Sequence, residues 1–118
     1  MDVAVILFAV LLSLFLAHEM DAVRKHEWVM LNLKDDEHSY RLFLIVHIPL
    51  YAVILTFILT GYDFIGFVIT DVFLISHLIV HVLFRNHSKN IMIDKLSLFL
   101  IYSAGLLAII HLFWILMI

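Results

Sequence analysis

The stretch AHEMDAVRKHEW, at residues 17–28, concentrates groups that can bind a metal or carry a proton. It contains two His-Glu pairs, an aspartate, an arginine and a lysine, and it directly follows a long apolar segment. Imidazole and carboxylate together are the ligands that zinc, non-haem iron and manganese take in proteins. Charged groups beside an apolar segment are costly unless they are paired or bind an ion, so this stretch is a candidate site.

Further histidines lie in other apolar segments. His77 and His81, in SHLIVH, are spaced i, i+4, so both imidazoles point from one face of a helix. That spacing allows one helix to supply two ligands to a single metal. His47 lies in a separate apolar segment, and His18 opens the first His-Glu pair. Three segments therefore contribute histidines, and their arrangement in space decides whether these form one site.

The composition identifies the surroundings of these groups as lipid. The chain has 118 residues, of which 65% are hydrophobic, and a mean hydropathy of +1.14. A soluble chain of this length could not bury so much apolar surface in one core. The absence of cysteine excludes disulfide scaffolds, thiolate catalysis and iron–sulfur clusters. The net charge of −3 excludes a basic surface for nucleic acid.

Four hydrophobic stretches are each long enough to cross a bilayer, which takes about 20 residues. We predict an all-α fold, an integral membrane four-helix bundle with antiparallel neighbours, formed by residues 1–118 as a single transmembrane domain. The expected helices are at about 3–20, 42–60, 64–84 and 96–118, with an amphipathic extension of the first at about 21–33. The first stretch lacks a positive n-region and a small-residue cleavage pattern, which indicates a retained helix rather than a signal peptide.

The basic residues predict the orientation. All seven lie in the two longer connections and none lies near the termini or the short Gly61 hairpin: Arg24, Lys25, Lys34, Arg41, Arg85, Lys89 and Lys95. The positive-inside rule then places both connections in the cytoplasm and both termini on the non-cytoplasmic side. We expect a multi-pass protein of the plasma (inner) membrane, with the lipid bilayer as its main partner.

This topology brings the histidines to one depth. His18 ends the first helix, and His47 lies five residues beyond Leu42, roughly 8 Å inside the same membrane face. His77 and His81 are seven and three residues short of the same end of the third helix. If the first helix continues straight, His18, Glu19, Asp21 and His26 share one arc of its surface, whereas Arg24 and Glu27 lie outside that arc.

We therefore predict a metal site near the cytoplasmic face, occupied by zinc or iron. The candidate ligands are His18, Glu19, His26, His47, His77 and His81, and the candidate catalytic residues are Glu19 and Asp21. Simpler interpretations exist. Glu19 and Asp21 could pair with Arg24 and Lys25 at the membrane surface, and His77 and His81 could form structural hydrogen bonds between helices.

Two further polar features have structural interpretations. Asp71 and His111 lie at matching depths, roughly 10 Å from the non-cytoplasmic side, which predicts a hydrogen bond between the third and fourth helices. Asp35 or Asp36 is expected to cap the start of the second helix.

The motif in residues 17–28 also carries a resemblance. An apolar helix that ends in His-Glu-x-Asp-Ala and is followed by His-Glu-Trp resembles a group of small bacterial four-helix membrane proteins. The matching residues are His18, Glu19, Asp21, Ala22, His26, Glu27 and Trp28. This resemblance implies a four-helix membrane fold and no particular activity.

The histidines are also similar to those of membrane di-iron hydroxylases and desaturases, which carry HxxxH and two HxxHH boxes. Only His77-x-x-x-His81 matches, and no HxxHH occurs in this chain, which argues against a complete di-iron site. The seven-helix membrane zinc hydrolases also use HxxxH, but they have nearly twice as many helices.

Three functions are compatible with these residues. The first is a metal-dependent membrane enzyme, an oxidoreductase or hydrolase, that acts on a lipophilic small molecule. The second is a haem-b or quinone-linked electron carrier or proton conductor, with His47 and His77 as axial iron ligands. The third is a non-catalytic small subunit of a larger membrane complex or of a homo-oligomer. Carboxylates beside the histidines favour a non-haem ion over haem.

Overall fold

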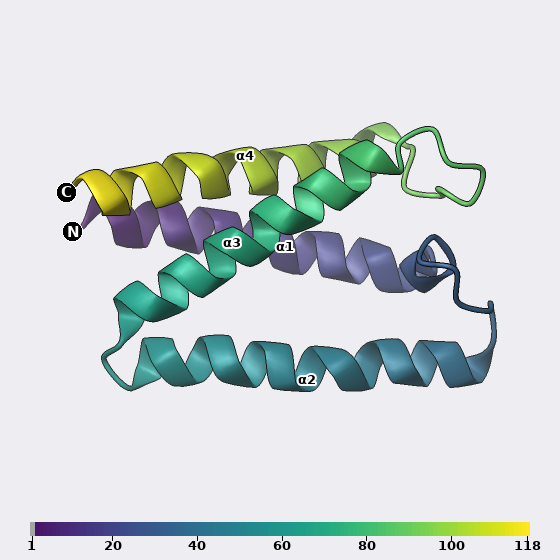
Figure 1. Ribbon diagram of the computed structural model, residues 1–118, viewed down its shortest axis with the longest axis horizontal. Helices are drawn as coiled ribbons and strands as arrows, with labels where there is room; N and C mark the ends of the chain where they lie inside the picture. Colours follow the sequence, from purple (N-terminus) through teal and green to yellow (C-terminus); the bar gives the residue numbers. More distant parts are fainter. Residues whose placement is uncertain (1) are drawn as a thin grey trace.

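The computed structural model describes residues 2–118 and contains four long helices and one short 3₁₀ turn (Figure 1). In chain order these are α1 (Val3–Arg24), η1 (Glu27–Val29), α2 (Glu37–Leu59), α3 (Asp63–Leu83) and α4 (Lys95–Met117). The two termini lie at the same end of the molecule, and η1 lies at the other end with the α3–α4 connection (Figure 1). The all-α, four-helix prediction is confirmed.

Aspartates fix the starts of three helices. The Asp2 side chain accepts a hydrogen bond from Ala4 N, and Asp94 accepts one from Ser97 N at 3.0 Å. Asp36 accepts one from Ser39 N at 2.8 Å, so of the two expected capping residues it is Asp36 that caps α2. Each carboxylate satisfies a backbone N–H that the first turn of a helix leaves without a partner.

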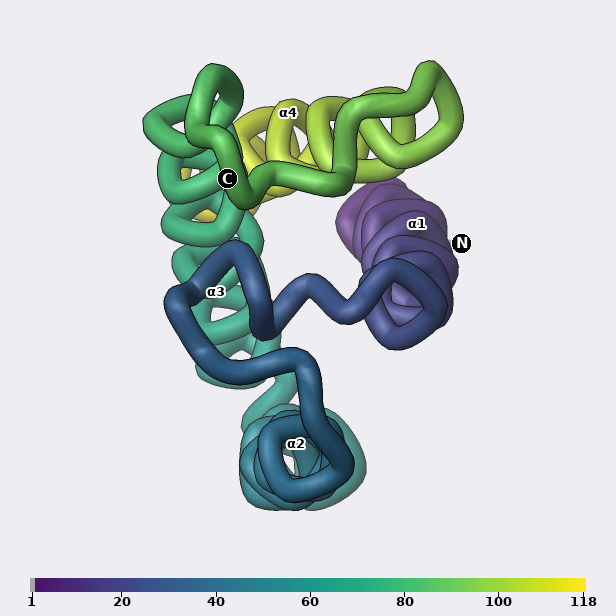
Figure 2. The backbone as a smooth tube through the Cα atoms, turned by 90° about the vertical axis from the view of Figure 1, so that its right-hand side faces the viewer, coloured from purple at the N-terminus to yellow at the C-terminus, as the bar shows by residue number. Residues whose placement is uncertain are grey.

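The helices do not form a closed square. α4 packs along both α1 and α3, and α3 also packs against α2. Viewed from the end, α1 lies beside α4 and α2 lies beside α3, and α1 and α2 stand apart from each other (Figure 2). The apolar core between α1, α3 and α4 consists of Phe8, Leu11, Phe15, Phe67, Leu74 and Ala108.

The exterior of the bundle suits lipid. All four helices qualify by length and composition as membrane spans, and most of their outward side chains are Leu, Ile, Val and Phe. A helix of 21 to 23 residues is about 32–35 Å long, slightly more than the roughly 30 Å hydrocarbon core. The chain is therefore a four-span membrane protein.

The segment after the first span differs from the expected amphipathic helix at residues 21–33. α1 continues only to Arg24, and His26 then takes a left-handed backbone conformation with φ 55°. A left-handed residue directly after a helix reverses the chain direction, and η1 follows as a single 3₁₀ turn. The structure also starts α2 at Glu37, five residues before the expected Leu42, because the Asp36 cap adds a polar first turn outside the apolar segment.

Candidate metal centre

Four side chains from three elements converge at the end of the bundle opposite the termini. They are His18 on α1, Glu27 on η1, and His77 and His81 on α3, and their ligand atoms all lie within 4.8 Å of one another. His77 Nε2 is 2.7 Å from His18 Nε2 and 3.1 Å from His81 Nε2. The Glu27 carboxylate is 2.6 Å from His81 Nε2, 3.4 Å from His77 Nε2 and 3.6 Å from His18 Nε2.

Ordinary hydrogen bonds do not satisfy this cluster. A neutral imidazole carries one N–H, so each Nε2 either donates a single bond or accepts one. If His81 Nε2–H donates to Glu27, His77 Nε2 still lies close to Nε2 of both His18 and His81. With only one proton or one lone pair, His77 Nε2 can form a hydrogen bond to only one of these two atoms. A cation at the centre would accept the lone pairs of all three imidazoles at once.

The cluster is largely shielded from its surroundings. The side chains of His18, Glu27 and His81 are each under 5% exposed, whereas that of His77 is 22% exposed. His77 is therefore the most exposed member of the cluster.

The chain reversal after α1 brings Glu27 into this site. Because His26 is left-handed, η1 folds back beneath the end of α1 instead of continuing along its axis. Trp28 then fixes η1, since its buried indole packs against the rings of Tyr40 and Phe43 on α2. The Glu27 side chain is thereby directed at α3.

The charge state of Glu27 suits a ligand. Burial acts to raise the pKa of the Glu27 carboxyl, but the hydrogen bond from His81 and the charges of the neighbouring histidines outweigh burial, and the net pKa is lowered. Glu27 is thus a carboxylate at neutral pH, as metal binding requires.

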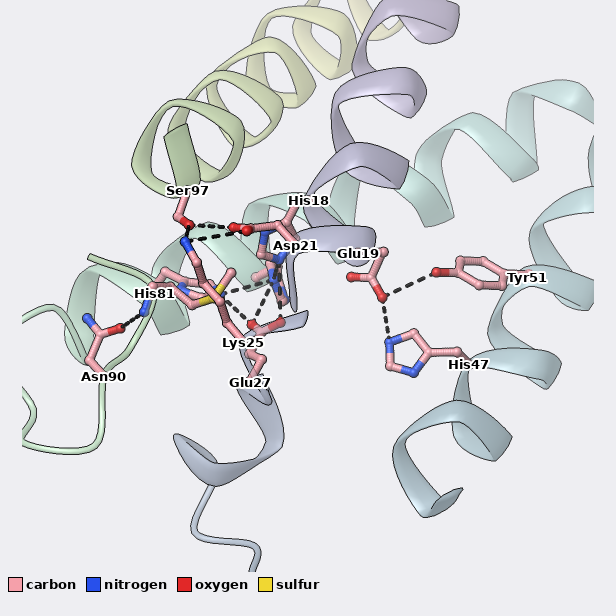
Figure 3. Close-up of polar contacts among 12 residues, drawn as sticks. His18, Glu19, Asp21, Lys25, Glu27, His47, Tyr51, His81, Asn90 and Ser97 are labelled. Carbon is pink, nitrogen blue, oxygen red and sulfur yellow. Dashed lines mark hydrogen bonds and ion pairs between the residues drawn. The ribbon is translucent and has the colours of Figure 1, made fainter. Parts of the chain in front are cut away.

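The candidate ligands from the sequence divide into separate groups. His18, His77 and His81 meet in the cluster, whereas His47 and Glu19 pair with each other at 2.8 Å on the side of α1 that faces α2 (Figure 3). His26 lies at the surface, about half exposed, and pairs with Asp35 at 2.7 Å.

Asp21, a candidate catalytic residue, belongs to a polar cross-link between α1 and α4. Its carboxylate accepts a hydrogen bond from Ser97 and lies 3.4 Å from Lys25 Nζ (Figure 3). Lys25 also pairs with Asp94 at 2.7 Å, and this contact lowers the pKa of the Asp94 carboxyl. This network joins the end of α1 to the start of α4, and it gives Asp21 a positioning role.

Glu27 is the member of the cluster that the sequence did not identify. If α1 ran straight through residue 27, Glu27 would point away from His18. The available signal was the second His-Glu pair itself, which repeats the pair at residues 18–19. A chain reversal at His26 could not be predicted from residue type alone, because only a small share of histidines are left-handed, although histidine takes this conformation more often than most non-glycine residues.

The predicted bond between Asp71 and His111 is confirmed. His111 Nδ1 and Asp71 Oδ2 are 2.7 Å apart, and both side chains are fully buried between α3 and α4. Asp71 Oδ1 and His111 Nε2 have no hydrogen-bond partner within residues 2–118. The pair lies outside the metal cluster and joins α3 to α4 near the other end of the bundle.

Fold and site together define a four-span membrane protein with a buried His/Glu cluster that could hold a metal ion. The chain belongs to a family of unknown function, DUF6713, whose family model matches residues 4–117. No curated protein and no solved structure matches the chain.

Proposed function

We propose that the protein is an integral membrane metalloprotein that binds zinc or non-haem iron through His18, Glu27, His77 and His81. We further propose that the metal serves a membrane enzyme whose substrate is lipophilic. The observation that carries the proposal is the convergence of three imidazole nitrogens and one carboxylate within 4.8 Å, at a buried position between three elements.

The spacing of these atoms fits a tetrahedral ion. Four ligand atoms at about 2.0–2.1 Å from a zinc ion lie roughly 3.4 Å apart in a tetrahedron. The contacts within the cluster range from 2.6 to 3.6 Å. For one ion to bind all four, the closest pair would separate by about 0.8 Å, and ligand atoms up to 4.8 Å apart would approach by up to about 1.4 Å.

The same geometry disfavours haem. Two axial imidazoles must stand on opposite sides of a flat macrocycle, with their nitrogens about 4 Å apart and nothing between them except iron. Here His18 and His77 are in direct contact, and His81 and Glu27 occupy the positions around them. His47, the other axial ligand considered, is paired with Glu19.

A catalytic role is supported by the ligand types and by the partial exposure of the His77 side chain. Three histidines are a ligand set of catalytic zinc, which keeps a further position for water or substrate. Glu27 would either complete this ligand set or lie beside the ion as a proton acceptor. A metal at this site would supply Lewis-acid chemistry. In this proposal Glu27 takes the role that sequence reasoning gave to Glu19 and Asp21, and substrate approaches beside His77.

Metal analysis of the purified protein tests the proposal. Protein extracted in mild detergent is expected to carry about one zinc or iron per chain, without a Soret band. His77→Ala and His81→Ala are each expected to lose most of this metal, because the loss of one ligand opens the coordination shell. His38→Ala and His87→Ala are matched controls, since both histidines are exposed.

Three results would contradict the proposal. A Soret band would indicate haem. Retention of metal by the His77 and His81 variants would place the site elsewhere. An absence of stoichiometric metal, even after incubation with zinc or ferrous iron, would leave the cluster as a structural hydrogen-bond network.

A further inference from the structure

A second polar group lies in a groove between α1 and α2, apart from the metal cluster. Glu19, His47 and Tyr51 form its polar centre: Glu19 Oε2 is 2.8 Å from His47 Nε2 and accepts a hydrogen bond from Tyr51 Oη at 3.2 Å (Figure 3). The groove has a volume of about 470 Å³, which is in the range of small-molecule sites. Its remaining lining is apolar: Leu16, Met20, Val23, Phe43, Leu44 and Ile48.

The groove faces the lipid. α1 and α2 stand apart where it lies (Figure 2), and Met20 and Ile48 on its two walls are 76% and 66% exposed. Both walls belong to candidate membrane spans. A lipophilic molecule could therefore enter sideways from the bilayer and place its polar end at Glu19.

The hydrogen bonds of the three polar side chains determine which head group fits. His47 Nδ1 donates to the carbonyl oxygen of Phe43 at 2.6 Å, so this nitrogen carries a proton. A second proton must lie between His47 Nε2 and Glu19 Oε2, because two bare lone pairs would repel each other at 2.8 Å. Whichever atom holds that proton, the pair has no net charge.

Every polar proton of Glu19, His47 and Tyr51 is therefore already used in a hydrogen bond. These side chains can still accept hydrogen bonds from a ligand, but they cannot donate one. The Tyr51 hydroxyl proton is used on Glu19, and within residues 2–118 no group donates to Glu19 Oε1. A head group that only accepts hydrogen bonds, such as an ether or a ketone, finds no free donor. A charged head group would bring an unpaired charge into a low-dielectric groove, which is costly.

We propose that this groove binds a single-chain lipophile with an uncharged head group that donates a hydrogen bond, the class of long-chain alcohols. The hydroxyl donates to Glu19 Oε1 or Tyr51 Oη, and the chain lies along Leu16, Met20 and Ile48. The inference goes beyond the proposed metal function and is independent of it, because no ligand of the metal centre lines the groove.

The structure also provides an internal control. A second groove on α1, of about 520 Å³, is lined by Val5, Ile6, Ala9, Val10, Ser13 and Leu14. It is as large as the first, and it offers one hydroxyl oxygen, on Ser13, whose proton is donated to the carbonyl oxygen of Ala9, but it lacks a carboxylate acceptor such as Glu19. Ligand that merely dissolves in the lipid around the protein should reach both grooves equally.

Photolabelling in phosphatidylcholine vesicles tests the inference. Hexadecanol with a diazirine in its chain is irradiated with the full-length protein, and the labelled peptides are mapped by mass spectrometry. We expect saturable labelling at Leu16, Met20 and Ile48, which excess hexadecanol removes. The methyl ether of hexadecanol and hexadecylammonium should not compete. Labelling of the control groove should stay low and should not saturate.

Two variants test the contacts and a third serves as their control. Tyr51→Phe removes one acceptor and is expected to weaken competition by hexadecanol about tenfold, the equivalent of one hydrogen bond. Ile48→Trp fills the groove from an exposed position and should abolish specific labelling, whereas Val10→Trp in the control groove should not change it. The metal-free His81→Ala variant should label like the unmodified protein.

Other outcomes would overturn the inference. Equal labelling of the two grooves would show simple partition into lipid. Competition by the methyl ether as strong as that by the alcohol would refute the donor requirement. Unchanged labelling in Ile48→Trp would place the ligand elsewhere, and lost labelling in His81→Ala would refute the independence of the two sites. Because metal content is measured separately, failure here leaves the metal proposal standing.

Discussion

Replacing Glu27 by glutamine tests the metal centre with the least change of shape. Glutamine has the size of glutamate but no charge, so it removes the anionic ligand without opening a cavity. Glu27 is buried, and its carboxylate lies within 3.6 Å of three imidazole nitrogens. We expect the variant to fold and to lose most of its stabilisation by metal.

The size of the effect follows from binding linkage. Free metal at a hundred times the dissociation constant stabilises a folded protein by about 2.7 kcal/mol. Loss of the carboxylate should weaken metal binding up to roughly 100-fold, by analogy with the 10–100-fold effect of partners outside the ligand shell. At the same metal concentration the stabilisation then falls to about 0.4 kcal/mol. At about 4 °C per kcal/mol for a chain of this size, the metal-induced rise in Tm drops from roughly 11 °C to about 2 °C.

The metal-free protein should also respond to Glu27→Gln, by a smaller amount. A hydrogen bond to a charged group contributes about 1.5–3 kcal/mol and a neutral one about 0.5–1.5 kcal/mol, so the change costs about 1–1.5 kcal/mol. The lowered pKa of Glu27 means that the fold stabilises the carboxylate over the acid. This stabilisation is fully present above about pH 4.5, the ordinary pKa of the group, and is lost as pH falls through the lower pKa of the folded state. The unmodified protein should therefore lose stability in acid more steeply than the variant.

Thermal unfolding in detergent, followed by circular dichroism with chelator and with zinc, measures these effects. Glu37→Gln is the matched control, because Glu37 makes an exposed surface pair with Arg41 at 3.0 Å. Its loss should change stability by less than about 1 kcal/mol and leave the metal response intact. If the Glu27 and Glu37 variants respond alike to zinc, Glu27 is not a ligand and the geometric reasoning is refuted.

Four other predictions follow from the structure. Cysteines at Tyr62 and Lys89 should react with impermeant reagents from opposite faces of intact cells, and labelling of both from outside would refute the orientation. Asp71→Leu should destabilise the protein by about 1–3 kcal/mol in thermal unfolding because it leaves His111 buried without its partner, and a second change of His111 to leucine should recover part of this loss. His26→Asn, a residue type that tolerates the left-handed conformation, should leave metal content, measured by elemental analysis, unchanged, since His26 pairs with Asp35 at the surface; a loss of metal in this variant would place His26 in the centre. With free metal held near its dissociation constant, occupancy should fall as pH drops below about 6, because protons compete with the ion for imidazole, and a metal affinity that does not change between about pH 7 and about pH 4 would exclude imidazole ligation.

The architecture was predictable because the bilayer allows few solutions. A chain in lipid must satisfy its backbone polar groups within each segment, so four apolar stretches of spanning length must be four helices. The short hairpin at Gly61 then makes α2 and α3 antiparallel neighbours. The depth of a side chain follows from its distance along a helix, which is why the Asp71–His111 bond and the common depth of His18, His77 and His81 could be predicted.

The sequence could not determine which side chains at the same membrane depth contact one another. His47 lies near the depth of His77, but its imidazole pairs with Glu19 across the groove between α2 and α1 and does not join the cluster. The angle at which helices pack depends on many side-chain contacts at once, and no single residue in the sequence encodes it.

The sequence by itself determined that this is a four-span membrane protein with histidines and acids gathered near one face. The tertiary structure alone decided which of them form the site. The left-handed turn at His26 directs Glu27 to the histidines of α3, and the separation of α1 from α2 leaves Glu19 in the lipid-facing groove. The apolar segments determine where the helices span the membrane and how deep each side chain lies. A chain reversal and the angle between two helices depend on how the whole bundle packs.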